Sequence, residues 1–215
     1  MSFENLFSIL SSISFYSLFL PLLISVFNAR YASKYLLPYQ ILIVVSALID
    51  ISNYVFVSAG INNYLVLRAY TFIEITLIIF FYWSFFRQYH NAVLLLIILP
   101  VYFIVAAIDY LINGPANFDN YATAFEALAF ALISLWSFYY MIRHMIFESI
   151  TGAPFFWFNT AILLYFGGNL ILFVFDNYLL RFQASSHQAL WAIHSVLNII
   201  YNIVLAIGFW KTRNQ

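Results

Sequence analysis

The residues of this sequence that could do chemistry are a few acids and histidines set inside long apolar stretches. Glu74 lies about ten residues into its stretch, which corresponds to roughly 15 Å along a helix. An ionisable group at such a depth in a bilayer is costly unless it is paired or hydrated, so it is a functional candidate by default. His194 is a second candidate, because imidazole changes its charge near neutral pH. These two residues predict the floor of a site for a small ligand or a proton.

Helical spacing adds further polar side chains to the predicted site. Residues three, four or seven apart share one face of a helix, and the last apolar stretch carries such a stripe through His187, His194 and Asn198. We do not expect so polar a face to contact lipid. We predict an outward-facing pocket with these ligand-binding residues: Asp50, Asn53, Glu74, Glu126, Asn169, His187, His194 and Asn198.

Some of these polar residues have an alternative, structural interpretation. Buried asparagines hydrogen-bond across neighbouring membrane helices, each contributing about 0.6–2 kcal/mol, and this use is open for Asn53 and Asn198. Asp109, Asp119 and Asp176 lie near the ends of their apolar stretches, where we expect water to solvate them.

The composition indicates the class of protein. Hydrophobic residues make up 65% of the chain and charged residues 7%, whereas soluble domains are about 45–50% apolar and about 25% charged. The net charge is zero, so no basic surface is available to attract nucleic acid. The absence of cysteine removes disulfides and thiolate metal sites.

The apolar stretches must form the elements that position the site. A helix needs about 20 residues to cross roughly 30 Å of hydrocarbon. We predict an all-α fold, a single domain over residues 1–215 that forms a bundle of seven transmembrane helices in the lipid bilayer. The predicted spans are Leu6–Phe27, Tyr39–Val57, Tyr64–Phe86, Ala92–Leu111, Tyr121–Ile146, Phe155–Phe175 and Gln188–Trp210.

The basic residues predict the orientation of the bundle, because cytoplasmic loops of membrane proteins carry an excess of Lys and Arg. Of the eight Lys and Arg residues, all but Arg68 and Arg181 lie on one side of the predicted spans. We therefore expect a multi-pass protein of the cell (inner) membrane, with its N-terminus outside and its C-terminus in the cytoplasm.

The residue set limits the cofactors. A retinal Schiff base needs a lysine inside a helix, and both Lys34 and Lys211 lie at predicted helix ends. His187 and His194 are seven residues apart, and helical side chains lean toward the N-terminus, so these two histidines are poorly placed to share one zinc ion. Zinc bound by His194 and Glu74 stays open as a minor alternative. No cofactor is predicted otherwise. No phosphate loop, dinucleotide fingerprint or nucleophile elbow is present, so no motif requires an enzyme.

Two segments carry a resemblance to a known group of proteins. LRAYTFIE (67–74) and HSVLNIIYNIVLAIGFWK (194–211) resemble stretches of small seven-helix bacterial membrane proteins often encoded near sensor histidine kinases. This resemblance implies a sensory or regulatory role with a cytoplasmic or membrane signalling partner. The chain departs from the intramembrane ceramidase-like and progestin-receptor-like hydrolases, because its last predicted helix lacks a His-x-x-x-His pair.

Three functions follow from these observations. The first is a receptor-like or sensory protein that binds a small ligand or proton and signals through a cytoplasmic partner. The second is a metal-dependent intramembrane hydrolase acting on a lipid-like substrate. The third is a small-solute or proton-coupled transporter, which a weak similarity between the first three and the last three spans would favour: Pro38 and Asp50 correspond to Pro154 and Asn169.

Overall fold

The computed structural model of this chain consists of helices and short connections. It describes residues 3–89, 92–115, 117, 119–182 and 184–214, without the side chains of residues 3, 4, 57, 177, 180–182, 184–187 and 214. Helix accounts for 88% of the structure, and the described residues contain no strand. The predicted all-α class is therefore confirmed.

Seven helical segments of the described chain are long and apolar enough to cross a membrane, as predicted. Their bounds are Asn5–Phe27, Lys34–Phe56, Tyr64–Phe86, Val93–Asn113, Asn120–His144, Pro154–Asp176 and Gln188–Lys211. The largest difference from the prediction is at the second segment, which begins at Lys34 rather than Tyr39, because the 3-10 turn η2 (Lys34–Leu36) leads directly into the helix.

The helices group into two compact units, which we describe separately. The first unit comprises residues 1–32 and 127–215, and the second comprises residues 33–126. Helix α6 (Asn120–His144) starts in the second unit and continues in the first. The prediction of a single domain is not tested by this grouping and stays a prediction.

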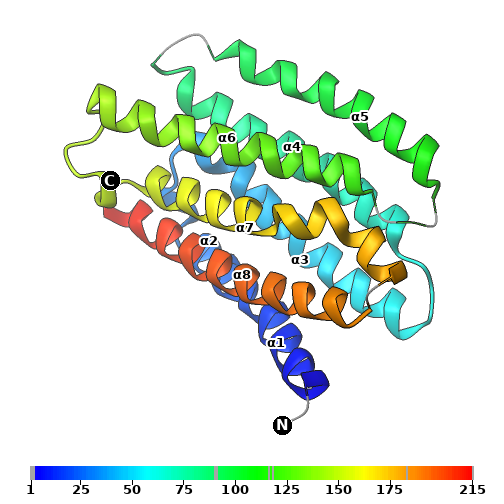
Figure 1. Cartoon of the computed structure of the whole chain (residues 1–215). Coiled ribbons are helices and arrows are strands. Elements are labelled where there is room, and N and C mark those ends of the chain that lie inside the picture. Colours follow the sequence, from blue (N-terminus) through cyan, green and yellow to red (C-terminus); the bar gives the residue numbers. More distant parts are fainter. Residues whose placement is uncertain (1–2, 90–91, 116, 118, 183, 215) are drawn as a thin grey trace. The chain divides into compact units, whose positions relative to one another are not determined.

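The first unit is built around its last helix, α8 (Ala184–Lys211). α7 (Pro154–Phe182) runs beside α8 over much of its length (Figure 1), and α1 (Phe3–Ser17) and α2 (Phe19–Phe27) also pack on α8. Short 3-10 turns complete the unit: η1 (Ala29–Tyr31), η4 (Ile150–Gly152) and η5 (Thr212–Asn214).

The first predicted span is interrupted between α1 and α2 at Leu18. Pro21 explains the break, because its ring clashes with the carbonyl of the residue four positions earlier, Ser17, and it has no N–H to bond that carbonyl. α1 and α2 together still form one apolar segment, Asn5–Phe27, that is long enough to cross a membrane.

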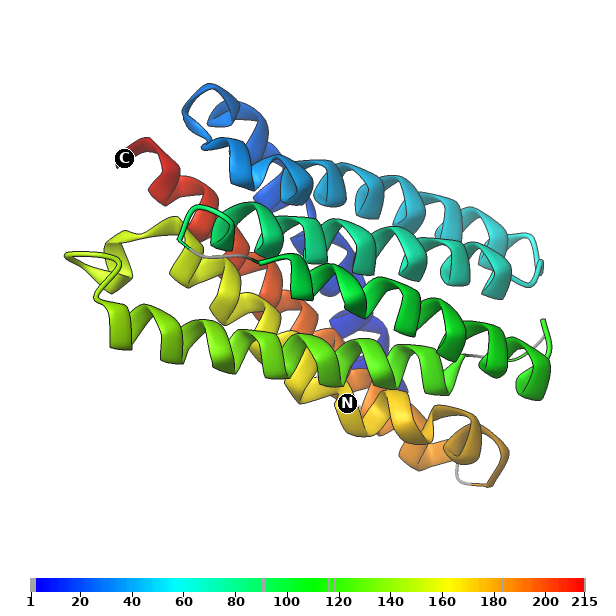
Figure 2. The same cartoon turned by 90° about the horizontal axis from the view of Figure 1, so that it is seen from above.

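The second unit contains α3 (Leu37–Ser58), α4 (Tyr64–Phe86), η3 (Val93–Ile97), α5 (Ile98–Asn113) and the start of α6. α3 and α4 lie side by side (Figure 2), and α5 packs on α4. One end of this pair is closed by aromatic side chains, where the buried ring of Tyr35 meets Phe85 edge-on at 5.3 Å and that of Tyr39 meets Phe81 at 5.2 Å.

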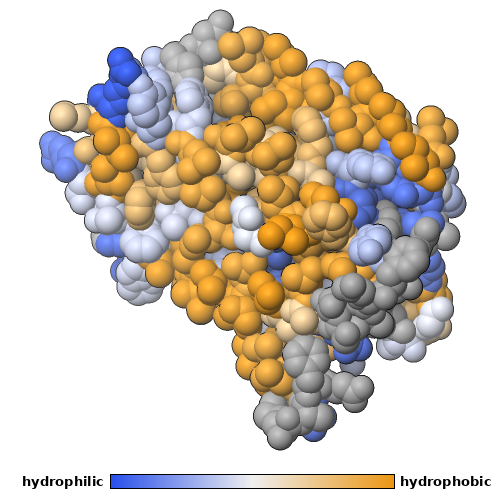
Figure 3. Space-filling model, in the orientation of Figure 1, coloured by the Kyte–Doolittle hydropathy of each residue, from blue (hydrophilic) through white to orange (hydrophobic). Residues whose placement is uncertain are grey.

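Hydrophobic side chains cover most of the face shown in Figure 3. Large apolar residues are exposed along the spans, including Leu48, Leu65, Ile104 and Ile171, each at least 60% exposed. A water-soluble protein rarely exposes so continuous an apolar surface. This surface is the one expected of helices that contact lipid.

Candidate functional site

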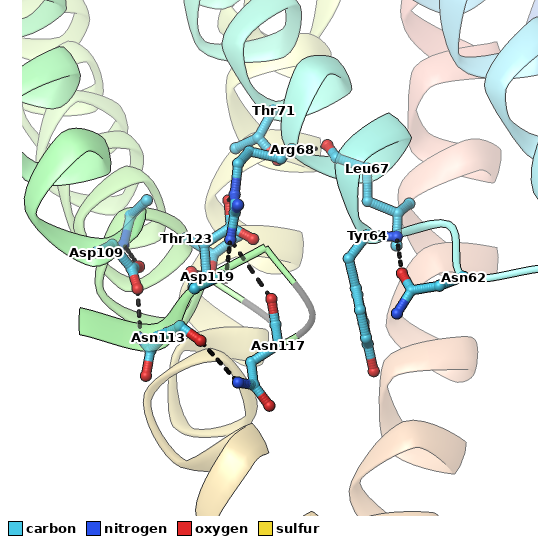
Figure 4. A network of polar contacts seen from close by, with 12 residues as sticks. Asn62, Tyr64, Leu67, Arg68, Thr71, Asp109, Asn113, Asn117, Asp119 and Thr123 are labelled. Atoms are coloured by element: carbon cyan, nitrogen blue, oxygen red, sulfur yellow. Dashed lines mark hydrogen bonds and ion pairs between the residues drawn. The ribbon is translucent and has the colours of Figure 1, made fainter. Parts of the chain in front are cut away.

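A polar network of the second unit forms around Arg68 on α4 (Figure 4). The Arg68 Nε donates to Asp119 Oδ2 at 3.1 Å, and its Nη2 donates to the carbonyls of Gly114 at 3.3 Å and Asn117 at 3.4 Å. The guanidinium carbon lies 5.0 Å from the ring centroid of Tyr110. Arg68 thus ties α4 to α5 and to the segment that precedes α6.

Asp109 holds the start of α6 in the same network. Its Oδ2 accepts the backbone N–H of Ala122 at 2.8 Å, and the Asn113 side chain donates to its Oδ1. A carboxylate that accepts an unpaired N–H in the first turn of a helix stabilises that helix end. Asp109 is fully buried, so its main use is structural.

The expectation that water solvates these end-lying acids is wrong. Asp109, Asp119 and Asp176 are 0%, 4% and 3% exposed, and protein groups bind all three. Burial raises the pKa of the Asp119 carboxyl above its ordinary value, while the neighbouring Arg68 guanidinium acts in the opposite direction. These three acids are therefore packed against protein groups rather than hydrated.

Three predicted site residues of the second unit form a separate group deeper in the spans. Glu74 on α4 is close enough to Asp50 on α3 and to Glu126 on α6 for their charges to interact. The Tyr70 hydroxyl donates to Glu74 Oε1 at 2.9 Å and also contacts Ser46 Oγ at 2.8 Å. We call Asp50, Glu74 and Glu126 the carboxylate group.

Two buried polar atoms at this group have no hydrogen-bond partner. Glu126 is 2% exposed and its Oε1 is unpaired; Tyr102 on α5 is fully buried and its hydroxyl is unpaired. The Tyr102 hydroxyl interacts electrostatically with the carboxylates of Glu126 and Glu74. Leaving a buried polar atom unpaired costs about 1–3 kcal/mol, so these atoms indicate a site rather than ordinary packing.

No described basic residue of the second unit forms an ion pair with the carboxylate group. The sequence of this unit contains four basic residues, Lys34, Arg68, Arg87 and His90. Arg68 pairs with Asp119, and Lys34 lies in η2, before the start of α3. Arg87 follows the last residue of α4, more than three turns from Glu74. The group is therefore suited to binding a proton or a small cation.

His194 and Asn169 come together in the first unit, where α7 meets α8. His194 Nδ1 lies 3.1 Å from Asn169 Oδ1, while Asn169 Nδ2 donates to the Tyr165 carbonyl at 2.9 Å. Because the amide nitrogen is used for Tyr165, the amide oxygen accepts from His194, and Nδ1 must carry a hydrogen. In the neutral ring Nε2 is then the acceptor nitrogen.

Aromatic rings surround this histidine. The ring centroid of Trp191 lies 4.8 Å from that of His194, and the ring of Tyr165 lies 5.6 Å away. The Trp191 indole N–H donates to Asp176 Oδ1 at 2.8 Å. Gly168 allows this close packing of α7 on α8, since a Cβ added there would lie 2.7 Å from Leu197 Cδ1.

A ladder of amides joins α8 to the first span. Asn198 Nδ2 donates to Ser14 Oγ at 2.8 Å, and Asn202 Nδ2 donates to Ser17 Oγ at 2.8 Å. These bonds provide the structural use that we left open for Asn198. Its assignment to a ligand stays a prediction.

The predicted pocket residues are divided between the two units. Asp50, Asn53, Glu74 and Glu126 belong to the second, where Asn53 Oδ1 accepts from Asn63 Nδ2 at 3.3 Å. Asn169, His194 and Asn198 belong to the first, and the side chain of His187 lies outside the described residues. Because Glu74 and His194 are in different units, a common pocket floor stays a prediction.

Sequence reasoning missed the unpaired Tyr102 hydroxyl and the Arg68–Asp119 pair. A tyrosine is ordinary in an apolar span, and no spacing rule joins two residues that are 51 positions apart. A groove of about 450 Å³ between α4 and α5 was also not predicted; it is lined by Arg68, Phe72, Phe103, Ala106, Ala107, Tyr110 and Leu111. None of the predicted ligand-binding residues lines this groove.

A metal site needs several His, Cys, Asp or Glu side chains that converge on one point. Within the described residues, no group of three or more His, Cys, Asp and Glu side chains is arranged to hold a metal ion. The carboxylate group is therefore not a metal site of this kind. Zinc bound by His194 and Glu74, which lie in different units, is not tested by this result.

Comparison with protein-family models, with curated proteins and with solved structures finds no match to this chain.

Proposed function

We propose that this chain is a multi-pass membrane protein of receptor-like or sensory type, in which the carboxylate group binds a proton or a small cationic ligand. The N-terminus would lie outside the cell membrane and the C-terminus in the cytoplasm, following the distribution of Lys and Arg. Binding would be passed to a signalling partner, since the connections at 28–36, 87–92 and 145–153 are too short to form a domain of their own.

One observation carries this proposal: the unpaired Glu126 Oε1 and the unpaired Tyr102 hydroxyl are buried within range of the charge of Glu74, and no described basic residue forms an ion pair with these carboxylates. Ionisable groups inside a membrane are costly and are usually retained for function. A proton or cationic ligand would supply the missing hydrogen or charge. Its uptake would change the charge balance between α3, α4 and α6 together.

Such a change can act as a switch. Binding shifts a protein toward whichever conformation it favours, and charge changes at helix contacts bias two-state elements. The Tyr70 hydroxyl couples Glu74 to Ser46 on α3, so loss of charge on Glu74 alters a contact between two helices. Movement of α3 against α4 is the signal that we expect a partner to detect.

An infrared titration tests the proposal with the proton as the probe. The protein is reconstituted in phosphatidylcholine vesicles, and the C=O stretch of protonated carboxyl groups is recorded as the pH is changed. We expect Glu74→Gln to remove part of the titrating signal. Glu126→Gln should remove another part and shift the midpoint of the remainder, because the two charges interact.

Glu148→Gln is the matched control, because Glu148 is an exposed acid on the 145–153 connection. Its loss should leave the Glu74 signal unchanged. Equal spectra for the wild type and Glu74→Gln would overturn the assignment. Native mass spectrometry with elemental analysis then separates the ligands: a bound organic cation supports the proposal, whereas stoichiometric zinc would make hydrolysis the better hypothesis.

A further inference from the structure

A second polar site lies in the first unit, at the end where residues 27–31 and 210–213 lie. α2 and α8 end side by side there, and a cavity of about 350 Å³ opens between their C-terminal ends. Its lining includes Phe27, Arg30, Tyr31, Trp210 and Arg213. We call this cavity the arginine pocket.

The two arginines of the pocket are not balanced by acids along their own segments. The sequence contains no Asp or Glu from residue 5 to 49 or from residue 177 to 215. Arg30 and Arg213 are both exposed, and both lie beside aromatic rings: Arg30 is 4.7 Å from the Tyr31 centroid and Arg213 is 5.9 Å from the Trp210 centroid. A guanidinium held against a ring keeps its N–H edges free for an anion.

Helix ends explain part of this arrangement. The free carbonyls at the C-terminus of a helix favour nearby cations, and both α2 and α8 end at the pocket. Any basic residue could interact favourably with these carbonyls, so the helix ends do not explain why two arginines share one cavity. Two guanidinium groups that line one cavity can both donate to a phosphate group, which accepts paired N–H bonds.

The remaining lining indicates where the phosphate comes from. Phe27 is 77% exposed and Trp210 is 55% exposed, so a phosphate in the pocket would be bordered by large apolar and aromatic surfaces. Trp and Tyr gather at the level of lipid head groups, and basic pockets between helices at the cytoplasmic side bind anionic head groups. From these features we infer that the arginine pocket binds the head group of an anionic phospholipid.

This inference depends on the chain spanning a membrane, as proposed above, but not on the carboxylate group. Failure of the infrared titration would leave it standing. Loss of lipid binding would likewise leave the carboxylate proposal untouched.

The test measures lipid binding by native mass spectrometry of the full chain in detergent. Phosphatidylglycerol is the probe and phosphatidylcholine the neutral comparison. We expect tighter binding of phosphatidylglycerol, weakened roughly fivefold by Arg30→Gln or Arg213→Gln and roughly twenty-five-fold by the double variant, since each basic residue contributes about that factor at an anionic membrane surface. Phosphatidylcholine binding should change little.

Arg143→Gln is the matched control, because Arg143 also lies over a ring, 5.6 Å from the Tyr139 centroid, but does not line the pocket. It should change phosphatidylglycerol binding less than twofold. Arg30→Lys with Arg213→Lys keeps both charges and should retain the preference even if the glutamine double variant does not fold.

Three results would overturn the inference. The first is equal affinity of the wild type for the two lipids. The second is a loss in Arg143→Gln as large as in the pocket variants, which would indicate a general charge effect. The third is binding of glycerol 3-phosphate as tightly as phosphatidylglycerol, which would identify a site for free phosphate instead.

Discussion

Arg68 and Asp119 form an ion pair whose side chains are only 7% and 6% exposed. Removing one member of a buried pair leaves the other charge without compensation, which typically costs about 3–5 kcal/mol. We therefore predict that Arg68→Met lowers the free energy of unfolding by about 3 kcal/mol, measured by thermal or denaturant unfolding in detergent. The double variant with Asp119→Asn should recover part of the loss. Full stability in Arg68→Met would mean that the pair contributes nothing.

The same pair predicts a pH dependence with a defined sign. In Arg68→Met the guanidinium that lowers the pKa of Asp119 is absent, whereas burial, which raises it, remains. The folded variant then keeps a proton on Asp119 at a pH where the unfolded chain has lost it. Because the folded state binds more protons, its stability should fall as the pH rises above about 4. The double variant, which has no carboxyl group at 119, should lack this slope.

Single residues also show how far sequence reasoning reached. The prediction of Glu74 and Glu126 as site residues rests on the cost of an acid in an apolar span, and in the structure the charges of these two residues interact. The sequence could not reveal the burial of Asp119, because its partner Arg68 is distant in the chain. Burial of the Tyr102 hydroxyl likewise depends on how α5 packs, which no local pattern encodes.

At the scale of elements, the contact between α7 and α8 depends on one of two adjacent glycines. A Cβ at Gly168 would lie 2.7 Å from Leu197 Cδ1, whereas a Cβ at Gly167 would meet only Leu163 at 3.8 Å. We predict that Gly168→Ala destabilises the protein by about 1 kcal/mol, because Leu197 must move in a packed contact. Thermal unfolding in detergent measures the change.

Gly167→Ala is the control on the same helix. It should be neutral or up to about 1 kcal/mol more stable, because alanine favours helix and the position has space. Combining Gly168→Ala with Leu197→Ala removes the clash, so the two effects should not add. Equal effects of the two alanine variants would show that packing at Gly168 does not limit the approach of α8.

The sequence predicts the ends of a helix well where the composition changes from apolar to polar. It predicts them less well where the backbone geometry sets the end of the helix. Apolar length located all seven spans, since each is bordered by polar residues or turns. The break at Leu18 and the 3-10 turns before α5 follow from Pro21 and Pro100, whose missing N–H groups disturb the preceding turn. Hydrophobicity carries no information about these local changes, although the prolines themselves do.

At the scale of the whole molecule, the uneven distribution of basic residues is the feature that predicts the orientation of the chain in the membrane. The basic residues Arg30, Lys211 and Arg213 gather at one end of the first unit. In the second unit the network of Arg68 with Asp109 and Asp119 lies at the end where α4 begins and α5 ends, opposite Lys34 and Arg87. From the positive-inside rule we predict that the ends with Arg30, Lys211 and Arg213, and those with Lys34 and Arg87, face the cytoplasm.

The absence of cysteine makes this orientation directly testable, because any introduced cysteine is the only thiol in the chain. Ile61 is 54% exposed on the connection between α3 and α4, and Glu148 is exposed on the connection between α6 and α7. We predict that a membrane-impermeant maleimide labels Ile61→Cys in intact cells and labels Glu148→Cys only after the membrane is permeabilised. The reverse pattern would invert the orientation, placing the arginine pocket outside the cell. Labelling of both sites in intact cells would contradict an odd number of spans between them.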